Sequence, residues 1–190
     1  PELRDLEEDF DESAFAAALI IRLSQIPSGA AGATRYHNLC MGICTFLFFP
    51  SLITPVKEYE QHRGRKRVDI KYTNAAKGGF FHRILSAPQT RALSVYIECK
   101  NYNRRVGNPE LDQLAGRFNL RQGKFGLLLC RKMEDRARVV AGCRDTFVDA
   151  RGVMLPLEDV DLTAMLRFVE NNQRDRVDGY LSNLFDEITA

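Results

Sequence analysis

The sequence is short of histidine, of net charge and of paired cysteines. Its three histidines, His37, His62 and His82, lie too far apart along the chain to suggest a zinc site. The net charge is only +2 over 190 residues. Any nucleic-acid-binding surface therefore has to come from local clusters of basic residues, and a uniformly basic binding protein is excluded.

No two of the five cysteines are spaced as a CxxC pair. Their odd number and scattered positions argue against a disulfide framework. Most of them lie in apolar runs, which is typical of buried thiols in a reducing compartment. We therefore expect a cytoplasmic protein with unpaired cysteines at Cys40, Cys44, Cys99, Cys130 and Cys143.

Long hydrophobic runs are absent as well. The longest, MGICTFLFFP at 41–50, is too short to span a bilayer, so we expect no membrane partner. The chain begins at Pro1 without a signal-like segment, and we expect it to belong to a longer protein with further domains. With 45% hydrophobic residues, it has enough apolar side chains to build a core.

The order of apolar patterns and breakers predicts an α/β fold with a mixed central sheet flanked by helices. The near-continuous apolar run at 124–131 is typical of a strand covered on both faces. We expect an N-terminal helix and linker over 1–32, a core over 33–157 and C-terminal helices over 158–190. The strands are predicted at 51–61, 67–73, 92–100, 124–131 and 153–156, with an excursion at 74–92 that holds a short helix near 80–85. The main helices are predicted at 1–26, 34–49, 108–122, 133–151, 157–172 and 174–188, with a linker at 27–33.

Two opposite charges, Glu98 and Lys100, interrupt an otherwise apolar strand in the stretch VYIECKNYN at 95–103. Because side chains alternate across a strand, both project from one face, and the apolar residues project from the other. The preceding strand, at 67–73, carries Asp69 among apolar neighbours in the same way. If the two strands pair, Asp69 and Glu98 converge.

Converging carboxylates point to a metal site. Two carboxylates at close range repel each other unless a cation lies between them. Oxygen ligands, few of them from protein, favour Mg²⁺ or Mn²⁺, with water and phosphate completing the shell. Lys100 could then orient or deprotonate an attacking water and stabilise the charge that develops on a phosphate.

These residues resemble the PD-(D/E)XK signature of nucleases with the restriction-endonuclease-like fold. Asp69 is followed by 28 residues and then by Glu98-Cys99-Lys100. IECKNY resembles the matching segment of Mrr-type restriction enzymes and archaeal Holliday-junction resolvases. LDQLAGRF follows where those families place a helix that carries a glutamine, here Gln113. The resemblance covers residues ~33–157.

The resemblance implies a three-layer sandwich and a metal-dependent deoxyribonuclease with a role in prokaryotic restriction or phage defence. Asp69 and Glu98 would bind the metal together with the backbone carbonyl of Cys99. Lys100 would be the catalytic lysine, and Gln113 would position a phosphate or a water. Double-strand cutting needs two active sites, so a homodimer or larger assembly is an expected partner beside DNA.

The sequence departs from the family pattern in three places. Val68 stands where the signature has proline, and the gap before Glu98 is long. Many relatives carry a glutamate in the helix before the first strand, where this chain has Tyr36 and His37. Glu58 or Glu60 on the first strand could instead supply a third acidic ligand.

Basic residues near the motif are candidates for contacts with nucleic-acid phosphates. The run HRGRKR at 62–67 predicts a tight basic turn beside Asp69, although such a turn can equally be a solvated surface. The candidates are Arg63, Arg65, Lys66, Arg67, Arg104 and Arg117.

Two other functions fit the same sequence. The first is a catalytically inactive relative that only binds nucleic acid or a partner protein. The second is an assembly module whose terminal helices dock neighbours. The presence of Asp69, Glu98 and Lys100 together favours the active nuclease over both.

Overall fold

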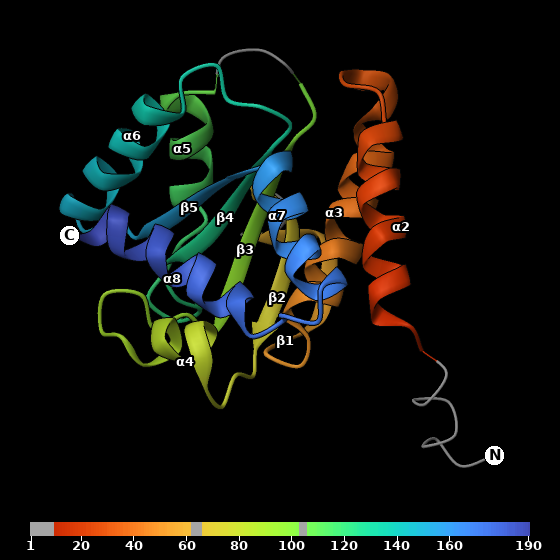
Figure 1. The fold of residues 1–190 in the computed structure, drawn as a ribbon. Coiled ribbons are helices and arrows are strands. Elements are labelled where there is room, and N and C mark those ends of the chain that lie inside the picture. The colour runs from red at the N-terminus through yellow and green to blue at the C-terminus, as the bar shows by residue number, and fades with distance from the viewer. Residues whose placement is uncertain (1–9, 62–65, 103–105) are drawn as a thin grey trace.

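A five-stranded mixed sheet forms the centre of the molecule (Figure 1). The structure is a computed structural model that describes residues 10–61, 66–102 and 106–190. The strands follow chain order across the sheet: β1 (Leu52–Gln61), β2 (Lys66–Asn74), β3 (Ser94–Lys100), β4 (Phe125–Cys130) and β5 (Val153–Glu158). β1, β2 and β3 pair antiparallel, whereas β3, β4 and β5 are parallel.

Helices cover both faces of this sheet, which gives three layers (Figure 1). The described helices are α2 (Glu12–Gln25), α3 (Ala30–Phe48), α4 (Gly79–Ser86), α5 (Asn108–Ala115), α6 (Arg136–Val148), α7 (Asp159–Glu170) and α8 (Arg176–Thr189). α3 packs on one face, where Tyr72 of β2 donates a 2.8 Å hydrogen bond to the carbonyl of Met41. α5 packs on the opposite face. There Leu114 of α5 lies so close to Gly126 of β4 that a Cβ atom added to the glycine would be only 3.0 Å from the leucine side chain. The predicted α/β class with a mixed, helix-flanked sheet is confirmed.

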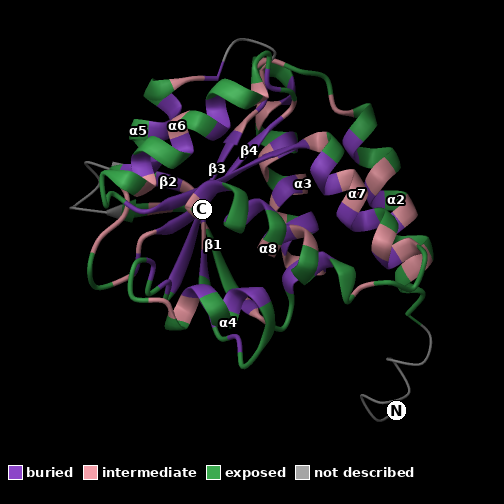
Figure 2. Ribbon diagram, turned by 60° about the vertical axis from the view of Figure 1, so that its left-hand side comes forward, coloured by how far each residue is buried: buried purple, intermediate pink, exposed green. Residues whose placement is uncertain are grey.

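The parallel part of the sheet is the most buried part of the molecule (Figure 2). Every residue of β4 and β5 is buried, and so is all of β3 except Lys100. This agrees with the near-continuous apolar run at 124–131. It also means that the two charged residues of β3 stand at the end of a strand that is otherwise inside the core.

α2 and α3 begin at different residues from those predicted. The side chain of Asp11 caps α2, which begins at Glu12. The predicted helical residues 1–9 lie outside the described residues. α3 begins at Ala30, inside the segment 27–33 that was predicted to be a linker, so the break between the two helices is shorter than expected.

α5 is also shorter than the helix predicted over 108–122. It ends at Ala115, and farther on the side chain of Asn119 accepts hydrogen bonds from two later backbone N–H groups, at 2.9 and 3.1 Å. Such side-chain bonds compete with helical ones. At the other end, Gly107 is the N-cap.

The terminal segments pack against the rest of the molecule. α2 lies against α7, and Arg131, which follows β4, joins them. Arg131 donates hydrogen bonds to the Leu23 carbonyl at 3.0 Å and to Asp159 at 2.9 Å. Among the described helices, none has the length and apolar character needed to cross a membrane.

Candidate active site

Strand register places Asp69 and Glu98 at the same end of the β2–β3 pair. The ladder runs from Thr73 opposite Ser94 to Ile70 opposite Ile97, and Asp69 and Glu98 are the next residues on the two strands. Alternation puts Lys100 on the same face as Glu98. The structure thus brings the two predicted carboxylates and the predicted lysine together where β2 begins and β3 ends.

Glu98 lies at the centre of this group and is fully buried. Its Oε2 accepts a hydrogen bond from Gln113 Nε2 at 3.0 Å and lies 3.5 Å from Lys100 Nζ. Lys100 Nζ in turn donates a 2.9 Å bond to Gln113 Oε1. The glutamine predicted from the sequence therefore holds both ends of the Glu98–Lys100 pair.

The environment of Glu98 disfavours its negative charge. Burial and, next, the nearby charge of Asp69 raise the pKa of Glu98 to about 7. Lys100 and Arg117 act in the opposite direction and offset part of this rise. A buried carboxylate whose ionisation is disfavoured by burial and by a second carboxylate nearby makes a site for an added cation.

A backbone group of β3 holds the side chain of Asp69, which belongs to the adjacent strand β2. Its Oδ2 accepts a 2.8 Å hydrogen bond from the backbone N–H of Cys99. The Cys99 side chain is buried, and its interaction with the Cys40 side chain, followed by burial, raises the pKa of its thiol. The thiol is therefore a packing group, and only the Cys99 backbone belongs to the site.

The donor set fits the expected metal. Glu98 Oε1 is buried and accepts no hydrogen bond within the described part of the chain. Together with Asp69 and the carbonyl of Cys99 it makes a small set of hard oxygen donors, which suits Mg²⁺ or Mn²⁺. Over the residues that the structure describes, no group of three or more His, Cys, Asp and Glu side chains is placed to hold a metal ion.

Neither of the two glutamates considered as a third acidic ligand, Glu58 and Glu60, lies beside Asp69 and Glu98 in the described part of the chain. Glu58 is exposed, with φ 53°, and its Oε2 lies 3.9 Å from Arg67. Glu60 stands opposite Arg67 in the β1–β2 ladder, farther toward the hairpin end than Asp69. The expectation that one of these glutamates completes the metal site is not met in this structure.

His37 is a site neighbour that sequence reasoning missed. Its Nε2 lies 4.0 Å from Asp69 Oδ2, and both side chains are 23% exposed. The neighbouring Tyr36 points elsewhere and donates a 2.8 Å hydrogen bond to Asp159. The available signal was the position of TRYHNLC, in the helix where nucleases with the PD-(D/E)XK pattern carry a glutamate.

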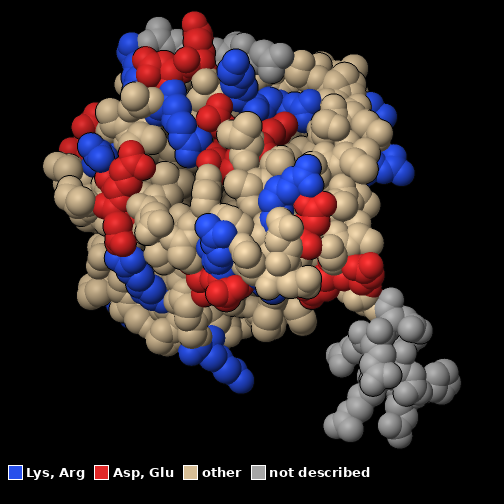
Figure 3. All heavy atoms as spheres, in the orientation of Figure 1, with Lys and Arg blue, Asp and Glu red and all other residues tan. Residues whose placement is uncertain are grey.

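The predicted phosphate-binding residues fall into three groups. Arg67 is exposed near the end of the β1–β2 hairpin, whereas Arg117 lies in the site, 3.8 Å from Glu98. Arg63, Arg65 and Arg104 lie outside the described residues, as does the side chain of Lys66. On the face drawn in Figure 3, basic and acidic side chains are interspersed, so no single basic patch dominates that face.

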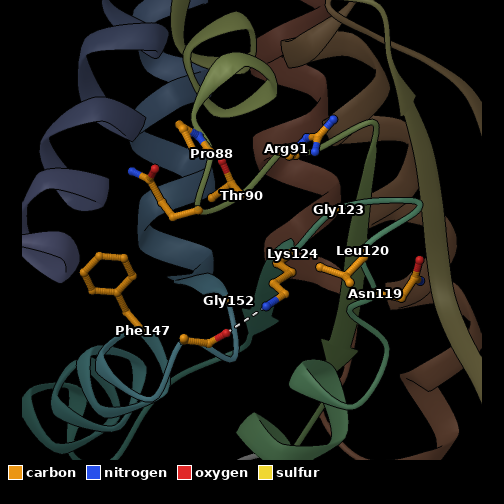
Figure 4. Close-up of a pocket in the computed structure, with 11 residues that line it drawn as sticks. Pro88, Thr90, Arg91, Asn119, Leu120, Gly123, Lys124, Phe147 and Gly152 are labelled. Atoms are coloured by element: carbon orange, nitrogen blue, oxygen red, sulfur yellow. Dashed lines mark hydrogen bonds between the residues drawn. The ribbon is translucent and has the colours of Figure 1, made fainter.

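A separate cavity of about 350 Å³ lies at the opposite edge of the sheet, before β3, β4 and β5 begin (Figure 4). Leu120 and Phe147 contribute apolar walls. Lys124, one of two basic residues that line it, donates a 2.9 Å hydrogen bond to the carbonyl of Ala150. None of the residues around Glu98 lines this cavity.

No protein-family model matches the chain, and no solved structure matches it. Over 123 residues the chain is 31% identical to an 80.3 kDa protein of transposon gamma-delta from Escherichia coli (strain K12). The match covers 65% of this chain and 17% of that protein, so the chain spans less than a fifth of this relative.

Proposed function

We propose that this chain is a metal-dependent deoxyribonuclease domain of the PD-(D/E)XK type, with the restriction-endonuclease-like fold. The observation that carries the proposal is the group around Glu98. Gln113 links the fully buried carboxylate of Glu98 to Lys100, two residues along the same strand. A second carboxylate, Asp69 on the adjacent strand, is held by the backbone N–H of Cys99. A cellular role in prokaryotic restriction or phage defence belongs to the same proposal and comes from the sequence resemblance.

Asp69, Glu98 and the Cys99 carbonyl would hold Mg²⁺ or Mn²⁺. The metal, when bound, would supply Lewis-acid stabilisation of the phosphate and acidify water. The Cys99 N–H fixes Asp69, and Gln113 fixes both Glu98 and Lys100. Preorganised groups of this kind need little rearrangement during the reaction.

Lys100 would act on the attacking water. Its side chain is 12% exposed and its Nζ is 2.9 Å from Gln113, so its orientation is fixed while its tip reaches solvent. In that position it can orient or deprotonate water and then stabilise charge on the phosphate. The DNA itself would approach along the sheet face that carries Asp69, which is half-buried, and Arg67, which is exposed.

A plasmid assay tests the function directly. Purified protein should nick or cut plasmid DNA with magnesium or manganese and stop when a chelator is added. Glu98→Ala and Asp69→Ala should be inactive while keeping the wild-type circular dichroism spectrum. A wild-type protein that leaves every form of DNA intact with both metals would contradict the proposal.

Calorimetry tests the metal site without relying on activity. Titration with manganese should give binding heat for the wild type and none for Asp69→Ala. Asp112→Ala is a matched control because Asp112 is an exposed carboxylate, paired with Arg151 at 2.7 Å. Unchanged binding in Asp69→Ala would move the metal site elsewhere.

An inactive nucleic-acid-binding or assembly module is the second candidate. It is favoured by the full burial of Glu98 and by the absence of a third acidic ligand within the described residues. This candidate predicts binding of DNA or of a second protein copy without any cutting. The same plasmid and calorimetry experiments separate it from the nuclease.

A further inference from the structure

Arg117 extends the group of side chains around Glu98. It lies four residues after Gln113, and its backbone N–H donates a 3.0 Å bond to the carbonyl of Leu114, so the chain still turns in the helical sense. Side chains spaced by four residues share one helix face. Gln113 reaches Glu98 Oε2, and Arg117 Nε lies 3.8 Å from the other oxygen, Oε1.

This contact differs from the structural ion pairs of the same chain. Arg131 reaches Asp159 at 2.9 Å, and Arg136 reaches Asp161 at 2.7 Å. Those distances are typical of charge-assisted hydrogen bonds, which are ~2.7–2.9 Å long. At 3.8 Å, Arg117 is near enough to act on the charge of Glu98 and too far for a hydrogen bond between these two atoms.

The position of Arg117 borders the place where Lys100 acts. Lys100 Nζ lies 3.5 Å from Oε2 of the same carboxylate whose Oε1 faces Arg117. Both cationic side chains keep a small exposed fraction, 12% for Lys100 and 14% for Arg117, whereas Glu98 has none. Two cations, each with a small exposed fraction, therefore flank one fully buried carboxylate.

We propose that Arg117 binds the non-bridging oxygens of the phosphate that is attacked, next to Lys100. This role rests on the proposed nuclease function and names a further catalytic residue for it. A guanidinium presents five N–H donors in a planar fork. One edge of the fork can face Glu98 while another matches two phosphate oxygens, an arrangement that a lysine cannot reproduce.

The test compares Arg117→Ala and Arg117→Lys with Arg121→Ala. Arg121 is exposed and four residues away, so its substitution removes the same charge from the surface. Arg117→Ala should lower kcat about 100-fold, as expected for one lost electrostatic contact in the transition state. Arg117→Lys, which keeps the charge without the fork, should lose about tenfold, and Arg121→Ala should match the wild type.

The substrate is an oligonucleotide with one methylphosphonate linkage, where a methyl group replaces a non-bridging oxygen. Neighbouring linkages serve as internal standards. The wild type should cut the modified linkage more slowly than its neighbours. Folded Arg117→Ala should lose most of this discrimination, because the contact that the modification removes is already missing.

A binding measurement in chelator adds a readout that does not depend on cutting. Fluorescence anisotropy with the unmodified oligonucleotide should show about tenfold weaker binding for Arg117→Ala and wild-type binding for Arg121→Ala. If the wild type cuts no linkage, the nuclease function fails and the binding result alone decides whether Arg117 contacts phosphate.

Three results would overturn the role of Arg117. An unchanged kcat in folded Arg117→Ala would show that Arg117 takes no part in the reaction. An equal loss in Arg121→Ala assigns the effect to surface charge. Full discrimination against the methylphosphonate in folded Arg117→Lys and Arg117→Ala leaves Arg117 as a support for Glu98 only.

Discussion

Two carboxylate clusters lie at the ends of parallel strands in the same sheet, and they are built in opposite ways. At the end of β5, Arg136 reaches Glu158 at 3.0 Å and Asp161 at 2.7 and 3.2 Å. Backbone N–H groups and the hydroxyl of Tyr180 complete the bonding of these carboxylates. At the end of β3, Glu98 has one 3.0 Å bond, and its two cations stay at 3.5 and 3.8 Å.

The difference lies in how far the chain itself compensates the buried charge. Short, numerous bonds compensate the cost of burying charge, as they do around Arg136. Glu98 lacks that compensation, and the second carboxylate, Asp69, adds repulsion. A buried carboxylate that the chain itself leaves partly uncompensated is what a metal or substrate site requires.

The largest expected effect comes from breaking the β5 cluster. Arg136→Ala should lower the free energy of unfolding by about 3 kcal/mol, because it leaves two buried carboxylates without their cation. Arg138→Ala is the matched control, since Arg138 is exposed on the same helix and contributes only its backbone N–H to a cap. Urea denaturation of both variants measures this effect. Equal stability of the two would show that the cluster is not structural.

The second effect concerns Lys100 and should appear in rate rather than stability. Lys100→Ala should cut plasmid nicking about 100-fold while leaving folding and DNA affinity close to the wild type. Lys132→Ala, an exposed lysine near the same sheet edge, should nick normally. A folded Lys100→Ala protein that nicks as fast as the wild type would reject the nuclease assignment of this motif.

The third effect is a pH dependence of stability in chelator. The pKa of Glu98 is raised to about 7 in the folded protein, so it keeps its proton where the unfolded chain releases it, between about pH 4.5 and 7. The unfolding free energy should therefore fall as the pH rises through this window. Glu98→Gln lacks this loss, so its free energy of unfolding should exceed that of the wild type by about 3 kcal/mol at pH 8.

Near pH 4.5 the advantage of Glu98→Gln should vanish, because wild-type Glu98 is protonated in the folded state. Thermal melts of both proteins at the two pH values give the comparison. A constant difference across the range would mean that the Glu98 environment does not shift its ionisation.

The smallest effect is on affinity and concerns the basic turn. Neutralising Arg63, Arg65 and Lys66 together should flatten the salt dependence of DNA binding by up to ~3 units of log–log slope, if all three contact phosphates. Neutralising Lys77 and Arg91, exposed toward the other edge of the sheet, should leave the slope unchanged. The same slope in all variants would make the turn a solvated surface.

Much of the architecture was predictable because its signals are local. The alternation of charge and apolar residues in VYIECKNYN placed Glu98 and Lys100 on one face, since the period of two depends only on backbone geometry. The apolar run at 124–131 likewise indicated a buried strand, which is β4. Helix ends were less predictable. Beyond α5, for example, the side chain of Asn119 accepts backbone hydrogen bonds that compete with helical ones.

The sequence by itself determined which strands carry Asp69, Glu98 and Lys100, and that Glu98 and Lys100 project from the same strand face. Only the tertiary structure decided what surrounds Glu98. Gln113 meets it because α5 packs against β3 and β4, and Arg117 meets it from the turn that follows α5. His37 meets Asp69 from α3, which covers the other face. These contacts join elements far apart in the chain, so they follow from packing and burial rather than from any local periodicity.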